Sequence, residues 1–127
     1  MKNLYIESSK YTAEINFNSG KGLLKISGNS YPEDAISFFE PVINWLEKYL
    51  ENCDKNVIME IKVNYINSSS SKSFIDIFEI LEEFHVNKGK IICRWFYEKG
   101  DDEILESGEE LLEDANFPFE FIEYETS

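Results

Sequence analysis

The chain has 127 residues, a length that predicts one domain and excludes two full-sized ones. Hydrophobic residues make up 43% of it and aromatic residues 15%, which excludes a wholly disordered chain. Its 25 acidic and 12 basic residues give a net charge of −13. Nucleic acid and anionic membrane surfaces are therefore excluded as expected partners, because both require clustered Lys and Arg. The charge is uneven, since 11 of the 25 acidic residues and none of the 12 basic ones lie from Asp101 onward.

The first half of the chain predicts two or three strands and one helix. The segments Tyr11–Phe17 and Leu23–Ile26 predict an antiparallel hairpin with a glycine-containing loop, and Leu4–Ile6 is a candidate edge strand. The sequence Ser30–Glu33 has the pattern of a capping box with proline in the first helical turn. Apolar residues at spacings of three and four then predict a helix, and Pro41 within it predicts a kink or a break.

The second half alternates strands with helices. Val57–Tyr65 alternates apolar and polar residues as a strand does, and Lys90–Tyr97 begins with an apolar run typical of a central strand. A helical stripe from Phe74 to Phe84 separates these two segments. A third helix should begin at Asp101–Glu103, where the acids favour its positive end, and Phe117–Tyr124 should return as a strand. We therefore predict one α/β domain over residues 1–127. Its mixed sheet should have about five strands, with an antiparallel N-terminal hairpin and parallel later strands, and three helices should pack on it.

Cysteine and histidine content limits the chemistry that the chain can carry. Cys93 lies in an apolar run and should be a buried thiol, whereas Cys53 lies near a helix end. A disulfide stays open on cysteine count alone, but we expect a reduced, cytoplasmic protein, since no signal peptide or membrane-spanning segment is evident. With His85 as the single histidine, a His-based zinc site or catalytic triad lacks its parts, and we expect no metal and no cofactor.

Four consecutive serines, Ser68–Ser71, stand between a predicted strand and a predicted helix. One interpretation is structural, because serine at such a turn is an ordinary helix N-cap. The other is functional, because a phosphate on one hydroxyl would meet unpaired N–H groups at the positive end of a helix. The two interpretations are compatible, since a serine at the helix start already points at that anion site.

Four short motifs are spread along the chain. They are Gly28–Asp34 (GNSYPED), Tyr65–Lys72 (YINSSSSK), Arg94–Tyr97 (RWFY) and Glu113–Phe119 (EDANFPF). Together they resemble the SiaC family of bacterial regulatory phosphoproteins. The likeness runs from about Leu23 to Ile122, and each motif is weak alone but specific in combination.

The resemblance implies a fold similar to the STAS domains of anti-sigma factor antagonists and a partner-switching function. In such a system a kinase phosphorylates a hydroxyl at the start of the helix after the Tyr65 strand, and a metal-dependent serine/threonine phosphatase removes the phosphate. The unmodified protein then binds and activates an output protein, for which a diguanylate cyclase is the expected example. Position in the motif makes Ser68 the phosphoacceptor, where a family member carries threonine, with Ser69 and Ser70 as weaker candidates. The expected partner contacts beside it are Asn67, Ser69, Ser70 and Lys72.

The same residues support other functions less well. An anti-sigma factor antagonist acting on an anti-sigma factor kinase is the nearest alternative. A hydrolase or transferase with a serine nucleophile lacks an evident base, because His85 lies a full helix away, so we expect no enzyme. Arg94 is the only arginine, and its place in a strand favours an ion pair over a phosphate clamp. Asp101–Glu103 lacks the ligand spacing and glycine of an EF-hand loop.

Overall fold

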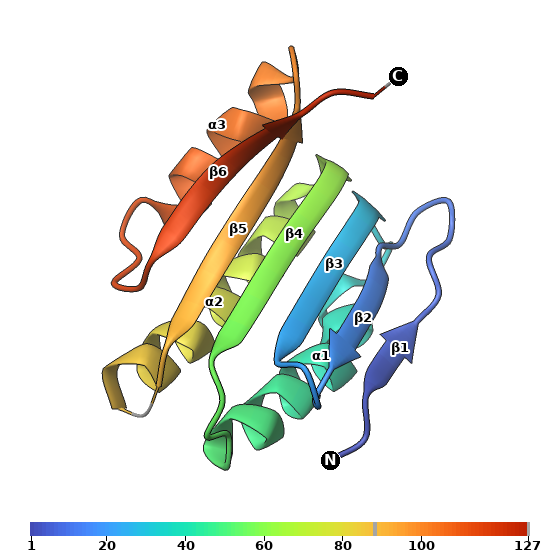
Figure 1. The fold of residues 1–127 in the computed structure, drawn as a ribbon. Coiled ribbons are helices and arrows are strands. Elements are labelled where there is room, and N and C mark those ends of the chain that lie inside the picture. Colours follow the sequence, from blue (N-terminus) through green and yellow to red (C-terminus); the bar gives the residue numbers. More distant parts are fainter. Residues whose placement is uncertain (88, 127) are drawn as a thin grey trace.

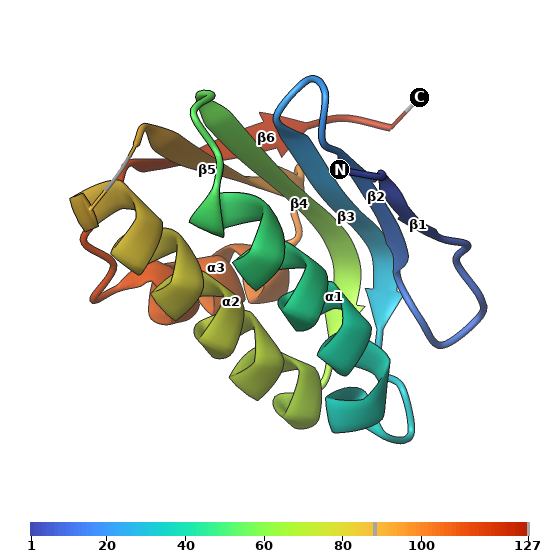
Figure 2. The same cartoon turned by 90° about the horizontal axis from the view of Figure 1, so that it is seen from below.

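A mixed sheet of six strands carries three helices on one of its faces (Figures 1 and 2). The computed structural model describes residues 1–87 and 89–126. The pairs β1–β2 and β2–β3 are antiparallel, and the pairs from β3 to β6 are parallel, so the predicted fold class is confirmed, with Leu4–Ile6 as an additional strand. The elements in chain order are β1 (Leu4–Ile6), β2 (Glu14–Asn18), β3 (Leu23–Ser30), α1 (Ala35–Glu51), β4 (Val57–Ile66), α2 (Ser68–Asn87), β5 (Ile91–Glu98), α3 (Asp102–Leu112) and β6 (Phe119–Tyr124).

The position of the helices follows from the strand order. The sheet runs β1-β2-β3-β4-β5-β6, which is also the order along the chain. Each connection between parallel strands passes through one helix, and such crossovers are right-handed. Because β3, β4, β5 and β6 follow one another in the same direction across the sheet, α1, α2 and α3 lie on the same face (Figure 2). The carboxyl ends of β3, β4 and β5 therefore meet the N-termini of the three helices at one edge of the sheet. Among the described residues, no helix covers the opposite sheet face (Figure 1).

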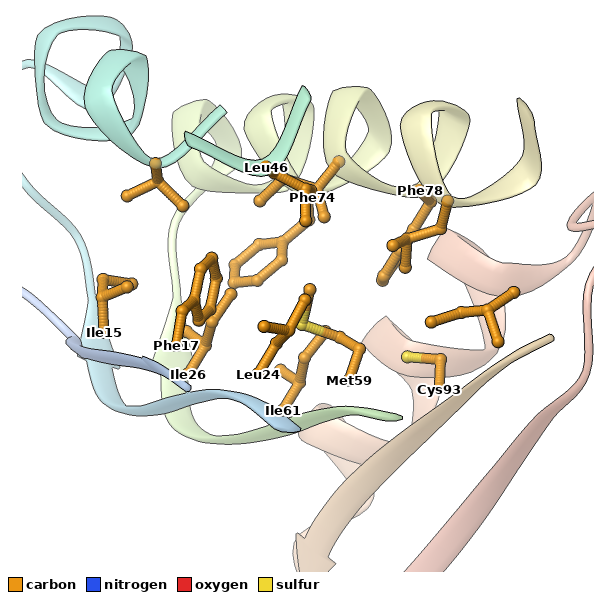
Figure 3. Packing of buried hydrophobic residues seen from close by; sticks show 14 of the residues in the cluster. Ile15, Phe17, Leu24, Ile26, Leu46, Met59, Ile61, Phe74, Phe78 and Cys93 are labelled. Carbon is orange, nitrogen blue, oxygen red and sulfur yellow. The ribbon is translucent and has the colours of Figure 1, made fainter. Parts of the chain in front are cut away.

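The hydrophobic core lies between the sheet and the helices. Alternate strand residues point toward the helices, and helix residues such as Leu46, Phe74 and Phe78 point back toward the sheet (Figure 3). Trp95 of β5 is fully buried, and its indole nitrogen donates to the carbonyl oxygen of Ile104 at 3.0 Å. Gly108 of α3 lies directly against this indole, which fixes how closely α3 packs on the sheet. The strand residues of this core that Figure 3 labels are Ile15, Phe17, Leu24, Ile26, Met59, Ile61 and Cys93.

The start of α1 differs from the prediction. Asp34 is the N-cap, accepting from the backbone nitrogen of Ser37 at 3.1 Å and from its hydroxyl at 2.8 Å. These hydrogen bonds hold the pKa of the Asp34 carboxyl below its ordinary value. Ser30, which the capping-box pattern placed at the helix start, is instead the last residue of β3 and pairs with Ile66 of β4. The predicted capping box was wrong because the parallel ladder between β3 and β4 extends four residues beyond Ile26.

Pro41 lies within α1 without breaking it, since the helix runs from Ala35 to Glu51. Proline removes the hydrogen bond to the carbonyl four residues earlier, that of Ser37. Both Pro41 and Ser37 are exposed, so water can solvate that carbonyl and the helix continues.

The two cysteines are free, and only Cys93 is fully buried. Burial raises the pKa of the Cys93 thiol far above its ordinary value, because the thiolate would lose its hydration. We expect a thiol reagent at pH 8 to modify the half-buried Cys53 in the native protein and to leave Cys93 unmodified until the protein unfolds. Intact mass after alkylation with and without urea measures this, and Cys53→Ser should abolish the native reaction. Modification of Cys93 at the native rate of Cys53 would contradict the burial.

Candidate functional site

The serine run forms the first turn of α2, and Asn67 is the residue that caps it. The side-chain oxygen of Asn67 accepts from the backbone nitrogen of Ser70 at 2.8 Å, and its carbonyl accepts from the backbone nitrogen of Ser71 at 3.0 Å. The expectation of a serine cap was therefore wrong, since asparagine, an equally good cap, precedes the serines. This cap leaves the backbone N–H groups of Ser68 and Ser69 without a hydrogen-bond partner among the described residues.

The four serine hydroxyls lie in different environments. Ser68 and Ser69 are exposed. Ser70 is 0% exposed, and its hydroxyl accepts from that of Ser30 at 2.9 Å. Ser71 is half-buried and donates to the carbonyl of Asn67 at 3.2 Å. A kinase can therefore reach the hydroxyls of Ser68 and Ser69 in the folded protein, whereas the Ser70 hydroxyl is accessible only if the start of α2 opens.

The buried Ser30–Ser70 hydrogen bond ties the start of α2 to the end of β3. Because both side chains are fully buried, replacing one of them leaves the other hydroxyl without its partner and away from water. We expect Ser30→Ala and Ser70→Ala each to lower the free energy of unfolding by about 1–3 kcal/mol.

The double variant Ser30→Ala/Ser70→Ala should lose less than the sum of the two single losses, because it leaves no orphaned hydroxyl. Urea denaturation of the three variants measures the coupling between the two side chains. Strictly additive losses would show that this hydrogen bond does not hold the helix start.

An aromatic cluster of Tyr11, Tyr31 and Tyr65 includes the strand residue three positions before Ser68. The Tyr31 ring packs edge-on against Tyr65, with ring centroids 4.9 Å apart, and against Tyr11 at 5.2 Å. Tyr11 and Tyr65 are each 51% exposed, and Ile36 in the first turn of α1 is 76% exposed. Protein-binding surfaces are enriched in exposed aromatic side chains of this kind. The signal in the sequence was Tyr65 itself, a large aromatic residue three positions before Ser68.

The charges around the serines are of both signs. Lys72, one helical turn after Ser68, is exposed, and the Lys10 nitrogen lies 5.5 Å from the centroid of the Tyr11 ring. The acids nearest in sequence are Glu60 on β4 and Asp76 on α2. Of the expected partner contacts, Ser69 and Lys72 face solvent, whereas the Asn67 side chain and Ser70 hold the helix start.

The remaining candidates lie away from this edge or are already paired. Arg94 donates from Nε to Glu120 at 2.8 Å and from Nη1 to Glu60 at 3.5 Å, as the prediction of an ion pair required. His85 lies near the other end of α2. Among residues 1–87 and 89–126, no group of three His, Cys, Asp or Glu side chains is arranged to hold a metal ion. In the same part of the chain, no helix combines the length and the apolar composition needed to span a bilayer.

The chain is similar to proteins of one family over nearly its whole length. The model of the SiaC family of regulatory phosphoproteins matches residues 6–124. An uncharacterised protein of Pseudomonas aeruginosa strain UCBPP-PA14 is 34% identical over 119 residues, which cover 94% of both chains.

The chain is also similar to solved structures of SiaC proteins. The crystal structure of apo-SiaC from Pseudomonas aeruginosa matches with a TM-score of 0.89 at 33% identity, covering 96% of this chain and 99% of that one. A crystal structure of the diguanylate cyclase SiaD in complex with its activator SiaC, from the same organism, matches with a TM-score of 0.91 at 32% identity, covering 95% of this chain and 99% of that one. The family match over residues 6–124 and the shared fold show that this chain belongs to the SiaC family of regulatory phosphoproteins.

Proposed function

We propose that phosphorylation of Ser68 decides which partner this chain binds. The observation that carries the proposal is the state of the serine run: Ser68 and Ser69 present free hydroxyls at the start of α2, whereas Ser70 and Ser71 use theirs inside the protein. The motif resemblance to the SiaC family also implies Ser68 as the phosphoacceptor, so we assign the phosphate to it and keep Ser69 as the second candidate.

The chemical effect of a phosphate at Ser68 is local. It would add a charge of about −1.5 to −2 beside the unpaired amides of Ser68 and Ser69, which favour an anion at a helix N-terminus. Lys72 lies on the same helical face one turn later and can neutralise part of that charge. The helix should therefore stay folded, and the phosphate should change the binding of partners that pack against Ser68 and the aromatic cluster.

The output partner that we propose is a diguanylate cyclase. The support is the structure of a relative, SiaC of Pseudomonas aeruginosa, in complex with the diguanylate cyclase SiaD as its activator. In our proposal the unmodified chain binds and activates the cyclase, with Asn67, Ser69, Ser70 and Lys72 at or next to the contact. A cognate kinase adds the phosphate and a metal-dependent serine/threonine phosphatase removes it. An anti-sigma factor kinase in place of the cyclase is the alternative.

We also propose that the chain acts without catalysis, and in the cytoplasm. A serine nucleophile at position 68 would need an activating base, and His85 lies 17 residues further along α2, about 26 Å at the rise of an α-helix. ATP for a kinase is available in the cytoplasm, and two free cysteines agree with a reducing compartment.

Phosphate incorporation from the cognate kinase tests the acceptor. Wild type and Ser69→Ala should each gain the mass of one phosphate, and Ser68→Ala should gain none. Peptide mapping should place the phosphate on Ser68, and phosphatase treatment should remove it. Full incorporation into Ser68→Ala with loss in Ser69→Ala would move the acceptor to Ser69, and incorporation into neither wild type nor variants would refute the switch.

A further inference from the structure

The sheet face without helices carries a row of four charged residues at one height. Lys25, Glu60, Arg94 and Glu120 are aligned by the strand registers on β3, β4, β5 and β6. Their signs alternate across the sheet, positive, negative, positive and negative. We refer to these four residues as the charged row. Figure 1 shows the sheet from this open side.

Neighbouring residues of the charged row are paired within the chain. Arg94 Nε lies 2.8 Å from Glu120 Oε1, Arg94 Nη1 lies 3.5 Å from Glu60 Oε2, and Lys25 Nζ lies 4.0 Å from Glu60 Oε1. The two end residues are the most accessible, with side chains 50% exposed for Lys25 and 46% for Glu120. Both ends, and the unused donors of the Arg94 guanidinium, can therefore pair with a second surface.

Half-exposed apolar residues flank the charged row on both sides along the strands. Leu23, Ile58 and Ile92 are in register on one side, and Phe96 and Ile122 on the other. Alternation places all five on the open face, because their sequence neighbours belong to the core. The open face thus has an apolar band on one side of the charged row, and on the other side Phe96 and Ile122 are in register with Ser27 and Lys62. Burial of the apolar residues would supply affinity and the charges would supply register.

We propose that the occupant of this face is a second copy of the chain, stacked about a two-fold axis that runs parallel to the strands. With the axis between β4 and β5, in the plane between the sheets, β3 lies over β6 of the second copy and β4 over β5. Lys25 then faces Glu120 of the second copy, and Glu60 faces Arg94. Each position of the charged row meets the opposite charge, and both halves of the interface are identical, as a two-fold contact requires.

The residues on either side of the charged row agree with the same axis. At unchanged height along the strands, Ile58 lies over Ile92 of the second copy, and Lys62 lies over Phe96, a cation beside an aromatic ring. A two-fold axis perpendicular to the strands, at the height of the charged row, would instead place each charge over its own copy, where like charges repel. Face-to-face sheets pack about 10 Å apart with strands within about 30° of parallel, which the first axis allows.

The net charge of −13 opposes association of two copies over long distances. Salt at about 0.15 M, where the Debye length is about 8 Å, screens this long-range repulsion. It weakens the attraction between close charge pairs inside an interface much less. Sedimentation velocity at this salt concentration, from low to high micromolar protein, should therefore show wild type shifting from monomer to dimer.

Two charge reversals test the axis. Lys25→Glu alone places glutamate against Glu120 at both symmetric contacts, and Glu120→Lys alone places lysine against Lys25 twice. Each should weaken dimerisation about tenfold or more. An equimolar mixture of the two variants should form a heterodimer of near wild-type affinity, because both of its contacts then join opposite charges. Lys48→Glu, an exposed lysine on α1 with the same change of charge, is the matched control and should dimerise as wild type.

Loss of folding would not explain a loss of dimer, because the substituted side chains are about half exposed. Thermal melts verify that every variant is folded. Heterodimer formation from two variants that are monomeric alone supports the proposal. A monomeric wild type at every concentration would overturn it, and so would a dimer that Lys25→Glu leaves unchanged. A dimer that the mixture fails to restore would overturn the assigned axis.

Discussion

Replacing Ser68 by aspartate is expected to weaken binding of the output protein about tenfold, and full phosphorylation more than a hundredfold. The hydroxyl is exposed in the first turn of α2, three residues after Tyr65 of the aromatic cluster. A partner that packs there would have to desolvate the added charge, and an uncompensated charge in an interface costs about 3 kcal/mol or more. Aspartate carries less charge and fewer acceptor oxygens than phosphate, so its effect should be partial.

Controls separate this effect from loss of folding. Ser68→Asn has nearly the shape of aspartate without its charge and should bind within about twofold of wild type, as should Ser68→Ala. Aspartate in the first turn interacts favourably with the helix dipole, so Ser68→Asp should melt at or slightly above the wild-type temperature. Titration calorimetry of the four proteins with the output protein measures the affinities. Equal weakening by Asp and Asn would attribute the loss to shape and remove the electrostatic account.

Gly108→Ala is expected to lower the free energy of unfolding by about 2–3 kcal/mol. A Cβ at this position would lie 2.5 Å from Nε1 and 2.6 Å from Cδ1 of Trp95. The indole cannot move aside easily, since it is fully buried, donates to the carbonyl of Ile104 and packs edge-on against Phe74. Alanine elsewhere in a helix stabilises by about 1 kcal/mol over glycine, so the sign of the effect reports the clash.

A second substitution tests whether Trp95 is the cause. Phenylalanine is smaller at the position of the indole nitrogen, so Trp95→Phe should relieve the clash, and Gly108→Ala/Trp95→Phe should lose less than the sum of the single losses. Glu109→Ala, an exposed change in the same helix, should stay within about 0.5 kcal/mol of wild type. Urea denaturation gives all four values. A stabilised Gly108→Ala would mean that α3 can shift away from β5 without cost.

The elements with strong periodicity were predictable from the sequence, and their ends were not. The alternation over Val57–Tyr65 corresponds to β4, and the stripe from Phe74 to Phe84 lies on α2. The ends of β3 and α1 were missed because a local pattern competed with pairing to a distant strand. Ser30 has the sequence of a helix cap, yet the ladder with Ile66 holds it in the sheet, past an irregularity in register between Gly28 and Asn29. Gly28 has φ +101°, a conformation that favours glycine.

The candidate site was found only in part from the sequence, because its distinguishing features are tertiary contacts. The serine run indicated a helix start and an anion site, but not which hydroxyls are free. That difference depends on Ser30, 40 residues earlier, whose side chain contacts the Ser70 hydroxyl in the buried region. The packing of Tyr31 between Tyr11 and Tyr65 likewise joins three segments that adjoin only in the folded sheet.

A single binding experiment tests the phosphorylation switch most directly. A mixture of unmodified and kinase-treated wild-type protein is passed over the immobilised diguanylate cyclase, and the intact masses of the retained and unretained fractions are compared. The proposed switch predicts that the retained protein is unmodified, and that the unretained protein carries one phosphate, mapped to Ser68. Equal proportions of the two forms in both fractions would contradict it.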